Sequence, residues 1–369
     1  MNILIFFVVL LVLVVVHEFG HFSMAKYFGI RVDEFGFGFP PKLFGIKNGE
    51  TEYTFNLLPI GGFVKIFGEN PDDENTNGPD RDRSFVNKPR WQQAIVLVAG
   101  VAANFLLAWL FFSIGFMSGL PTSVSNEANG QTLTDVNLTV INVAPESPAE
   151  KAGLKSGDKI VSVMHMHESQ EHTILEEINP VTFKSFVVEH SEEEIEVGYV
   201  RGKDAEVLKV KIIPTGADGS PKIGISMDMI GTAKLPVLSS FWEGAKLTWF
   251  MTKNTAVGLF SLVFDAVRGQ GSLDNVTGPV GMVGIAGNAY QFGFVYLLSF
   301  AALISVNLGI INLLPFPALD GGRLFFLLIE KIKGSRIKPS IANTANAIGF
   351  SLLILLMVFI TYHDIAKLF

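Results

Sequence analysis

The sequence predicts a polytopic α-helical membrane protein that also contains a membrane-associated β-rich region and one α+β domain outside the bilayer. Hydrophobic residues make up 49% of the 369 positions and the mean hydropathy is +0.40, which is more apolar than soluble domains of this total length. Four long apolar stretches are present, and an acidic region at positions 120–240 lies between the second and the third. The chain is therefore expected to cross a lipid bilayer four times.

Charge and cysteine content exclude several classes of protein. The formal net charge is −7 and the pI is near 5.6, so the chain lacks the basic surface that a nucleic-acid-binding protein needs. It contains no cysteine, which excludes a disulfide framework, a cysteine nucleophile and a thiolate metal site. Any bound metal must therefore use nitrogen and oxygen ligands.

Four segments are apolar enough to span a bilayer, which takes about 20 residues of helix. The first begins with the uninterrupted apolar run 3–16, and it lacks the basic start and the small-residue cleavage site of a signal peptide. Small residues in the second span predict close helix packing, and Asn104 at its centre predicts a hydrogen bond between helices. The four predicted spans are 3–22, 94–119, 292–314 and 342–362.

A fifth apolar segment, 241–264, carries Glu243, Lys246 and Lys253. These charges predict an amphipathic helix that lies in the membrane interface rather than a span. Topology favours the same interpretation. If this segment crossed the bilayer, the ends of the first and third spans would lie on opposite sides of the membrane, and Asp320 could not approach His17.

Basic residues predict the orientation of the chain. With four spans, the loops 23–90 and 315–340 share one side, and positively charged residues beside spans favour the cytoplasmic side. Positions 120–240 carry 10 Lys and Arg against 18 Asp and Glu, so this region is predicted to be a solvated, extracytoplasmic domain. The basic residues near the membrane are Lys26, Arg31, Lys88 and Arg90 in the first loop and Lys331, Lys333, Arg336 and Lys338 in the second.

This topology divides the chain into a first membrane half (1–119), an extracytoplasmic domain (120–232) and a second membrane half (233–369). Within the first half, positions 31–68 are rich in Phe and Gly and alternate with period two, which predicts strands and hairpins. This β region either caps the membrane helices or receives a substrate segment, and its composition fits both roles. The polar positions 70–82 are predicted to form a flexible loop.

The extracytoplasmic region shows a strand, a short helix and a second strand in succession. Ser147-Pro148 is a helix start signal, and a glycine-bounded turn follows it. The run 147–160, Ser-Pro-Ala-x-x-Ala-Gly-Leu-x-x-Gly-Asp-x-Ile, resembles a PDZ domain. The resemblance implies capture of an extended peptide or protein segment as an added strand, and a purely structural domain is the alternative. Further strands are predicted at 195–200, 207–213 and 223–227.

The sequence His17-Glu18-Phe19-Gly20-His21 ends the first apolar segment. Residues four apart share one face of a helix, so the two imidazoles can bind one metal ion while Glu18 lies beside it as a general base. Histidine and glutamate are costly in hydrocarbon and mark a functional site there. The motif therefore predicts a zinc site with two ligands from the first span.

A catalytic zinc site needs a third protein ligand. Asp320 is favoured because it follows the third span on the same side as the histidine motif, where Pro315 and Pro317 break the helix. An ordinary helix cap is the alternative role of Asp320. The cluster from His165 to His172 has the composition of a metal site but is predicted to be an exposed polar loop on the opposite side. The other candidates are His167, His190, His363 and the acidic residues.

The histidine motif and the run 312–321, Asn-Leu-Leu-Pro-Phe-Pro-Ala-Leu-Asp-Gly, together resemble the site-2 protease family of intramembrane metalloproteases. The resemblance covers most of the chain, including 61–65, 278–281 and the PDZ-like region. It implies zinc bound by His17, His21 and Asp320, with Glu18 as the catalytic base. The residues that the resemblance assigns to substrate binding are Asn307, Asn312, Gly61, Gly62 and Phe63.

The resemblance implies hydrolysis of peptide bonds within or near the membrane segments of single-span proteins, such as anti-sigma factors or signal-peptide remnants. It places the protein in the cytoplasmic membrane of a bacterium, with the active site near the cytoplasmic side. By this resemblance, the proteobacterial members that regulate sigma factors contain two PDZ-like units in tandem, whereas 120–232 has room for only one. A catalytically inactive PDZ scaffold and a metal transporter are the alternative functions, and an intact Glu18 argues against the scaffold.

Overall fold

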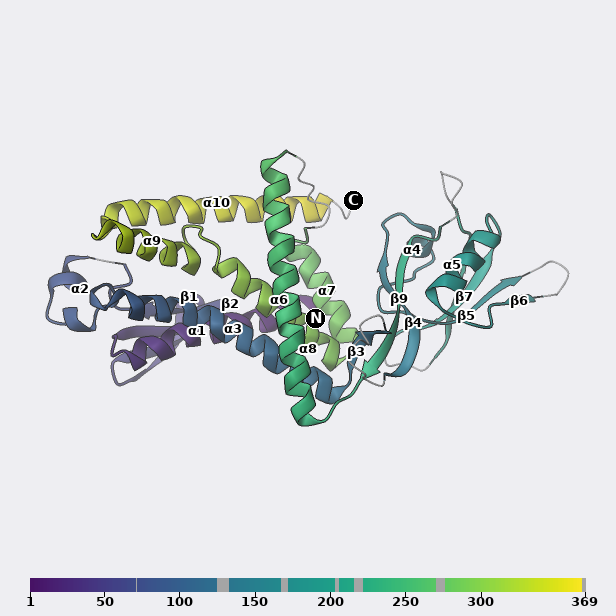
Figure 1. Cartoon of the computed structure of the whole chain (residues 1–369), viewed down its shortest axis with the longest axis horizontal. Helices are drawn as coiled ribbons and strands as arrows, with labels where there is room; N and C mark the ends of the chain where they lie inside the picture. The colour runs from purple at the N-terminus through teal and green to yellow at the C-terminus, as the bar shows by residue number, and fades with distance from the viewer. Residues whose placement is uncertain are drawn as a thin grey trace. The chain divides into compact units, whose positions relative to one another are not determined.

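A computed structural model describes residues 1–70, 72–124, 133–166, 172–202, 206–215, 222–269 and 276–366 (Figure 1). The chain divides into two compact units. The first, called the helical unit, consists of Met1–Ser113, Phe241–Asn288 and Leu298–Phe369. The second, called the sheet unit, consists of Ile114–Ser240 and Ala289–Leu297.

Four helices among the described residues are long and apolar enough to cross a membrane. They agree with the four predicted spans to within a few residues at each end, except that the first continues five residues further. The third is shorter than predicted because Gly293, with φ +117°, separates it from the preceding helix α7 (Pro279–Phe292). The four helices are α1 (Asn2–Tyr27), α3 (Arg90–Ser118), α8 (Phe294–Asn312) and α10 (Pro339–Ala366).

Helix α6 (Val237–Val267) corresponds to the charged apolar segment and is longer than predicted at both ends. It is not among the four candidate spans. Its apolar side chains Leu247, Met251 and Leu259 pack against a buried cluster from α3 and α8. Figure 1 shows α6 running across the direction shared by α1, α3 and α10. This direction agrees with the prediction that the segment does not span the bilayer beside the other helices.

Helices α1 and α3 cross with their backbones in direct contact. A Cβ atom added to Gly20 would lie 2.3 Å from the Ala99 carbonyl oxygen and 2.8 Å from the Gly100 Cα. Cβ atoms are not found this close to backbone atoms, so only glycine fits at position 20 without moving a helix. The small-residue face that the sequence predicts on the second span is therefore the surface on which α1 packs.

The β region is a two-stranded sheet of long strands, β1 (Val32–Asn48) and β2 (Thr51–Ile66). Both strands bend, so that 34–37 pairs with 62–65 and also with 52–55, while 42–48 pairs with 51–56. The hairpin prediction is confirmed, although its strands are longer than expected. Several large apolar side chains near the bends and the tip are exposed: Phe39, Leu43, Phe44, Ile46, Leu57 and Leu58.

The polar stretch 70–82 differs from the predicted flexible loop, because part of it is helical. A short helix, α2 (Asp73–Asn77), begins at a reciprocal cap in which the Asp72 carboxylate accepts from the Asn75 backbone N–H at 2.7 Å. The Asn75 side chain accepts in turn from the Asp72 N–H at 3.0 Å. Such a capping box satisfies two backbone donors and starts a helix even in a polar, acidic segment. Two 3-10 turns, Arg81–Arg83 and Phe85–Asn87, follow.

The sheet unit contains a seven-stranded antiparallel sheet with the order β3-β9-β4-β5-β7-β8 and β6 paired with β5. Helices α4 (Pro148–Lys151) and α5 (Pro180–Glu189) accompany it, and Leu138, Ile160, Phe183 and Ile195 are among its fully buried residues. The strands are β3 (Leu120–Ser123), β4 (Thr134–Val143), β5 (Lys159–Met166), β6 (His172–Ile174), β7 (Ile195–Val200), β8 (Leu208–Ile212) and β9 (Ile225–Ala233).

The start of α4 agrees with the sequence prediction. Ser147 is the N-cap, its hydroxyl accepts from the Glu150 N–H at 3.2 Å, and Pro148 occupies the first turn. The later strands also lie within two residues of the predicted starts, whereas α5 was not predicted. Helix α5 begins at Asn179, whose side chain accepts from the backbone N–H groups of Val181 and Thr182. This Asn-Pro start is a local signal of the same kind as Ser147-Pro148.

The contact between α1 and α3 predicts the effect of a single added methyl group. Gly20→Ala should lower the free energy of unfolding by about 1–3 kcal/mol, because the new Cβ meets backbone atoms that cannot rotate away. Thermal unfolding of the detergent-solubilised protein would measure the change. Gly258→Ala in α6 is the matched control, since a Cβ there meets no atom within 4 Å and should stabilise the helix slightly. Equal stability of the two variants would contradict the proposed helix contact.

Candidate metal centre and active-site cavity

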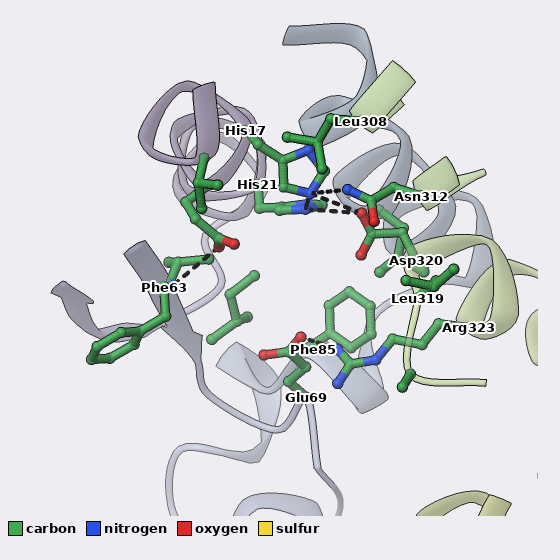
Figure 2. Close-up of a pocket in the computed structure, with 16 residues that line it drawn as sticks. His17, His21, Phe63, Glu69, Phe85, Leu308, Asn312, Leu319, Asp320 and Arg323 are labelled. Carbon is green, nitrogen blue, oxygen red and sulfur yellow. Dashed lines mark hydrogen bonds and ion pairs between the residues drawn. The ribbon is translucent and has the colours of Figure 1, made fainter. Parts of the chain in front are cut away.

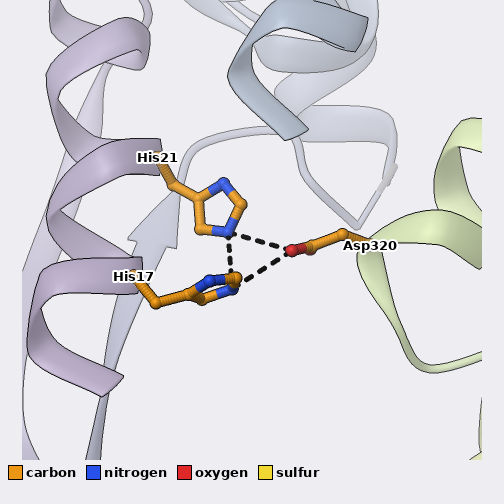
Figure 3. Close-up of side chains that lie close together, drawn as sticks. All are labelled: His17, His21 and Asp320. Atoms are coloured by element: carbon orange, nitrogen blue, oxygen red, sulfur yellow. Dashed lines mark hydrogen bonds and ion pairs between the residues drawn. The ribbon is translucent and has the colours of Figure 1, made fainter. Parts of the chain in front are cut away.

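His17 and His21 project from one face of α1 and are both buried. Their Nε2 atoms lie 3.1 Å apart. Asp320 Oδ2 lies 3.1 Å from His17 Nε2 and 3.2 Å from His21 Nε2, which closes a nearly equilateral triangle (Figure 3). The structure thus brings together the three residues that the sequence selected as a ligand set, although 299 positions separate His21 from Asp320.

The triangle has the dimensions of a zinc site. Zinc binds nitrogen and oxygen ligands at about 2.0–2.2 Å, and in tetrahedral geometry such ligands lie about 3.3 Å apart. The observed edges are 3.1 to 3.2 Å. Asp320 Oδ2 is buried and has no hydrogen-bond partner among the described residues, a state that is costly for a carboxylate unless a cation neutralises it. Two imidazoles and one carboxylate leave a fourth position for water.

The second nitrogen of His21 supports this role. Its Nδ1 lies 2.8 Å from the Val96 carbonyl oxygen, which can only accept a hydrogen bond. The Nδ1 atom of the neutral ring therefore carries the proton, and the Nε2 lone pair is directed at the triangle. A hydrogen bond from the distal ring nitrogen to a carbonyl is the usual support of a metal-binding histidine.

Asn104 on α3 performs the same task for His17. Its side-chain amide nitrogen lies 3.1 Å from His17 Nδ1, while its Oδ1 is buried and has no partner in the described part of the chain. A half-turn of the amide exchanges the two atoms, so that Oδ1 accepts from His17 Nδ1–H and the Nε2 lone pair is left for a metal. Asn104 thus makes the predicted contact between helices, and its partner is a candidate ligand.

Asp320 reaches the triangle because the chain turns sharply after α8. The turn 313–319 includes Ala318 with φ +76°, and Gly322 packs so closely that an added Cβ would lie 2.1 Å from the Phe316 carbonyl oxygen. Helix α9 (Asp320–Lys333) then begins at Asp320. Its N-cap is Leu319 and no side chain caps it, so the alternative role of Asp320 as a helix cap is wrong.

Glu18 and the three residues of the triangle line one cavity with a volume of about 300 Å³. Figure 2 shows this cavity with His17, His21 and Asp320 labelled. The Glu18 Oε2 atom accepts a hydrogen bond from the Val64 backbone N–H at 3.1 Å. The carboxylate is therefore attached to the edge of β2 rather than to another charged group. Phe63 and Asn312 also line the cavity, and the Asn312 amide nitrogen lies 3.4 Å from His17 Nε2.

The other residues predicted to bind substrate do not line this cavity. Asn307 accepts a hydrogen bond from the Thr255 hydroxyl on α6 at 3.2 Å. Gly61 and Gly62 are buried where β2 lies on α1: a Cβ at Gly61 would touch Val14, and one at Gly62 would be 2.9 Å from the Gly36 carbonyl oxygen. Their direct role is in packing the hairpin against the histidine helix.

The run 278–281, which the family resemblance includes, has a structural role at the start of α7. The Gly278 and Gly281 backbone N–H groups donate to the two carboxylate oxygens of Asp364, at 3.1 and 2.9 Å. Asp364 belongs to α10 and is buried. A carboxylate at a helix N-terminus satisfies donors that the helix itself leaves free.

Two charged residues of the cavity were missed by the sequence analysis. Arg323 lies one turn after Asp320 on α9 and forms an ion pair with Glu69 across the cavity. The spacing of three residues between Asp320 and Arg323 placed them on one helix face, so the sequence contained a signal for Arg323. Glu69 has no such signal, because it follows β2 in an irregular segment.

The remaining histidine candidates lie elsewhere. His363 is on α10 and belongs to no group of metal-ligating side chains among the described residues. His165 is buried in β5 at 5% exposure, so the expectation of an exposed polar loop is wrong for this residue. It pairs instead with His190 and Glu193 in the sheet unit. His167, with the rest of 167–171, lies outside the described residues, and so does the His172 side chain.

Known proteins resemble this chain along its whole length. A family model described as peptidase family M50 matches residues 5–356. The zinc metalloprotease RasP of Geobacillus kaustophilus is 31% identical over 454 aligned positions, which cover 100% of this chain and 98% of the relative. The regulator of sigma-W protease RasP of Bacillus subtilis is 32% identical over 442 positions, which cover 99% and 98%. Both alignments exceed the 369 residues of this chain, so both relatives carry additional residues.

The matched range contains the histidine motif of α1, the β hairpin, the sheet unit and the turn that precedes Asp320. The family model and the full-length relatives agree on a zinc-dependent peptidase. Four helices suited to a bilayer agree with a protein of the bacterial membrane. The chain therefore belongs to peptidase family M50, the site-2 protease family, and is a membrane-embedded zinc metalloprotease.

Proposed function

We propose that the chain hydrolyses peptide bonds within or near the membrane segments of single-span proteins, with zinc bound by His17, His21 and Asp320 and with Glu18 as the general base. The observation that carries this proposal is the triangle of three ligand atoms with 3.1 to 3.2 Å edges inside a cavity lined by Glu18. The position of Glu18 in that cavity favours an enzyme over an inactive scaffold.

When bound, zinc lowers the pKa of a coordinated water and polarises the carbonyl of the peptide bond. Glu18 takes a proton from the attacking water and passes it to the leaving amine. Val96 and Asn104 hold the two imidazoles in the tautomer that leaves Nε2 free, and the turn before α9 holds Asp320. The chain thus supplies an oriented ligand set and a single carboxylate for proton transfer.

The substrate must unwind before it is cut, because a membrane helix hides its peptide groups in its own hydrogen bonds. One edge of the strand segment 62–65 pairs with 34–37 of β1. Its other edge pairs with no strand among the described residues, and Phe63 and Val64 line the cavity. An extended substrate can add to this edge as a strand. A substrate carbonyl that accepts from Val64 N–H would replace Glu18 as its partner and release the base for catalysis.

We place the active site near the cytoplasmic side of the bilayer. His17 lies 15 residues after Asn2, the first residue of α1, which puts it roughly 22 Å along a helix that rises about 1.5 Å per residue, within a hydrocarbon core of about 30 Å. The exposed apolar side chains at the hairpin tip would enter lipid, because an apolar patch of this kind is unfavourable in water. Helix α6 would then lie in the membrane interface.

We propose that positions 120–232, which make up most of the sheet unit, form an extracytoplasmic PDZ-like domain. Helix α4, the turn that follows it and the start of β5 make up the run 147–160 that resembles a PDZ domain. We propose that this domain binds a peptide or protein segment and controls access to the membrane site. Since the relative from Bacillus subtilis is named a regulator of sigma-W protease, an anti-sigma factor is a reasonable first substrate to test, together with signal-peptide remnants.

The role of Glu18 predicts a variant that binds metal but does not cut. Glu18→Gln should retain about one zinc per chain at the triangle and lose about 10²- to 10⁴-fold in cleavage rate, the contribution of a general base. Cleavage of a single-span test protein in detergent and elemental analysis of zinc would measure both. Glu74→Gln, an exposed position on α2, is the control and should cut normally. Full cleavage by Glu18→Gln would exclude this mechanism.

The role of Asp320 predicts a variant that loses metal. Asp320→Ala removes one of three ligands, so zinc content at the triangle and cleavage should fall together. Asn312→Ala is the comparison, because it alters the same cavity without removing a proposed ligand. It should keep zinc and raise KM. Retention of both zinc and activity by Asp320→Ala would show that the third ligand is another residue.

The edge of β2 predicts a defect in substrate binding without loss of zinc. Val64→Pro removes the backbone N–H that now donates to Glu18, and proline is tolerated on an edge strand where that N–H faces outwards. Zinc content should be unchanged, while KM should rise several-fold because one hydrogen bond to the added strand is lost. Val64→Ala, which keeps the N–H, is the matched control. Equal KM values for the two variants would argue against strand addition at this edge.

A further inference from the structure

A second group of metal-ligating side chains lies in the sheet unit and shares no residue with the candidate active site. His165 is on β5, His190 is the C-cap of α5, and Glu193 lies in the turn before β7. One nitrogen of each imidazole and one carboxylate oxygen lie within 4.8 Å of one another. Both histidines are buried, whereas Glu193 is exposed.

The orientation of both rings suits metal binding. His165 Nδ1 lies 3.2 Å from the Glu194 carbonyl oxygen, and His190 Nδ1 lies 2.9 Å from the Phe186 carbonyl oxygen. A carbonyl can only accept, so each neutral ring carries its proton on Nδ1 and has its lone pair on Nε2. This is the arrangement found for His21 and Val96 in the first site, and it is the usual support of a metal-binding histidine.

The spacing of the two rings also resembles that of the first site. The ring centroids of His165 and His190 are 4.6 Å apart, compared with 4.7 Å for His17 and His21. Glu193 Oε2 lies 3.3 Å from His165 Nε2, within the distance that separates two ligands of one zinc ion. Three groups with electron pairs to donate therefore lie close together, two on buried histidines and one on an exposed glutamate.

We propose that His165, His190 and Glu193 form a second binding site for a divalent transition metal, for which zinc fits the two imidazoles and one carboxylate. The site is independent of the active site in ligands and in position on the chain. It joins β5, the end of α5 and the turn before β7. Metal binding would fix the end of α5 against the sheet and so stabilise the unit proposed to bind peptide segments.

The same contacts could instead represent an ion pair between the His165 imidazolium and Glu193, without a metal. The two explanations differ in stoichiometry. With the second site, the full-length protein in detergent, equilibrated with zinc and desalted, should hold about two zinc ions per chain. His17→Ala/His21→Ala should hold about one, and so should His165→Gln/His190→Gln. This comparison separates the second site from the active site, because each double variant removes a different ion.

Because substitution of the buried histidines can cause the protein to misfold, a variant at an exposed ligand provides a second test. Glu193→Gln alters an exposed side chain and should weaken zinc binding at this site at least about tenfold, as measured by competition with a chelator in the His17→Ala/His21→Ala background. Glu192→Gln, the adjacent exposed glutamate, is the matched control and should bind as before. In the same background, cobalt should give the visible absorption of a nitrogen and oxygen site, and His165→Gln/His190→Gln should abolish it.

Two results would overturn the proposal. The first is about one zinc per chain in the wild-type protein, with none in His17→Ala/His21→Ala. The second is a second zinc ion whose affinity is the same in Glu193→Gln and Glu192→Gln. Neither result bears on the active-site assignment, because the cleavage assays of Glu18→Gln and Asp320→Ala test that assignment separately.

Discussion

The structure depends on one constraint: the polar groups that we propose to catalyse hydrolysis must be held inside an apolar helix bundle. A histidine or carboxylate in such surroundings is stable only if every polar atom has a partner. His21 is satisfied by the Val96 carbonyl, His17 by Asn104, and Glu18 by the Val64 N–H. The atoms that remain, two Nε2 and one carboxylate oxygen, face one another. A divalent cation is the partner that completes this set.

Close helix contact makes these bonds possible. The Val96 carbonyl reaches His21 because α3 approaches α1 at Gly20 and Gly100, where a side chain would strike backbone or the imidazoles themselves. Gly322 has the same function beside Asp320, since it lets α9 start directly under the preceding turn. These glycines therefore affect the site indirectly, because they allow the helices and the turn to approach closely enough for its side chains to meet. Each permits an approach that a methyl group would prevent.

The proposed base, Glu18, and the proposed substrate edge of β2 share a single backbone group. The Val64 N–H serves Glu18 in the present structure and is also the donor that an added strand would use. In the proposed mechanism, substrate binding and proton transfer would thus be linked by competition for one hydrogen bond. In the sheet unit, the second histidine pair shows the same construction rule, because carbonyl oxygens of Glu194 and Phe186 orient both rings.

The sequence by itself determined the features that arise from local periodicity. Continuous apolar runs located the four membrane helices, the spacing of four placed His17 and His21 on one face, and Ser147-Pro148 located α4. Span topology and the family resemblance also selected Asp320 as a partner for the histidines, and the structure brings the three together. Only the tertiary structure decided the other distant contacts: Asn307 accepts from Thr255, and His165 is buried beside His190. The physical reason is that sequence periodicity shows which face of a helix or strand is buried. Contacts between residues that are far apart in the sequence depend instead on packing and on the hydrogen bond that each buried polar atom needs.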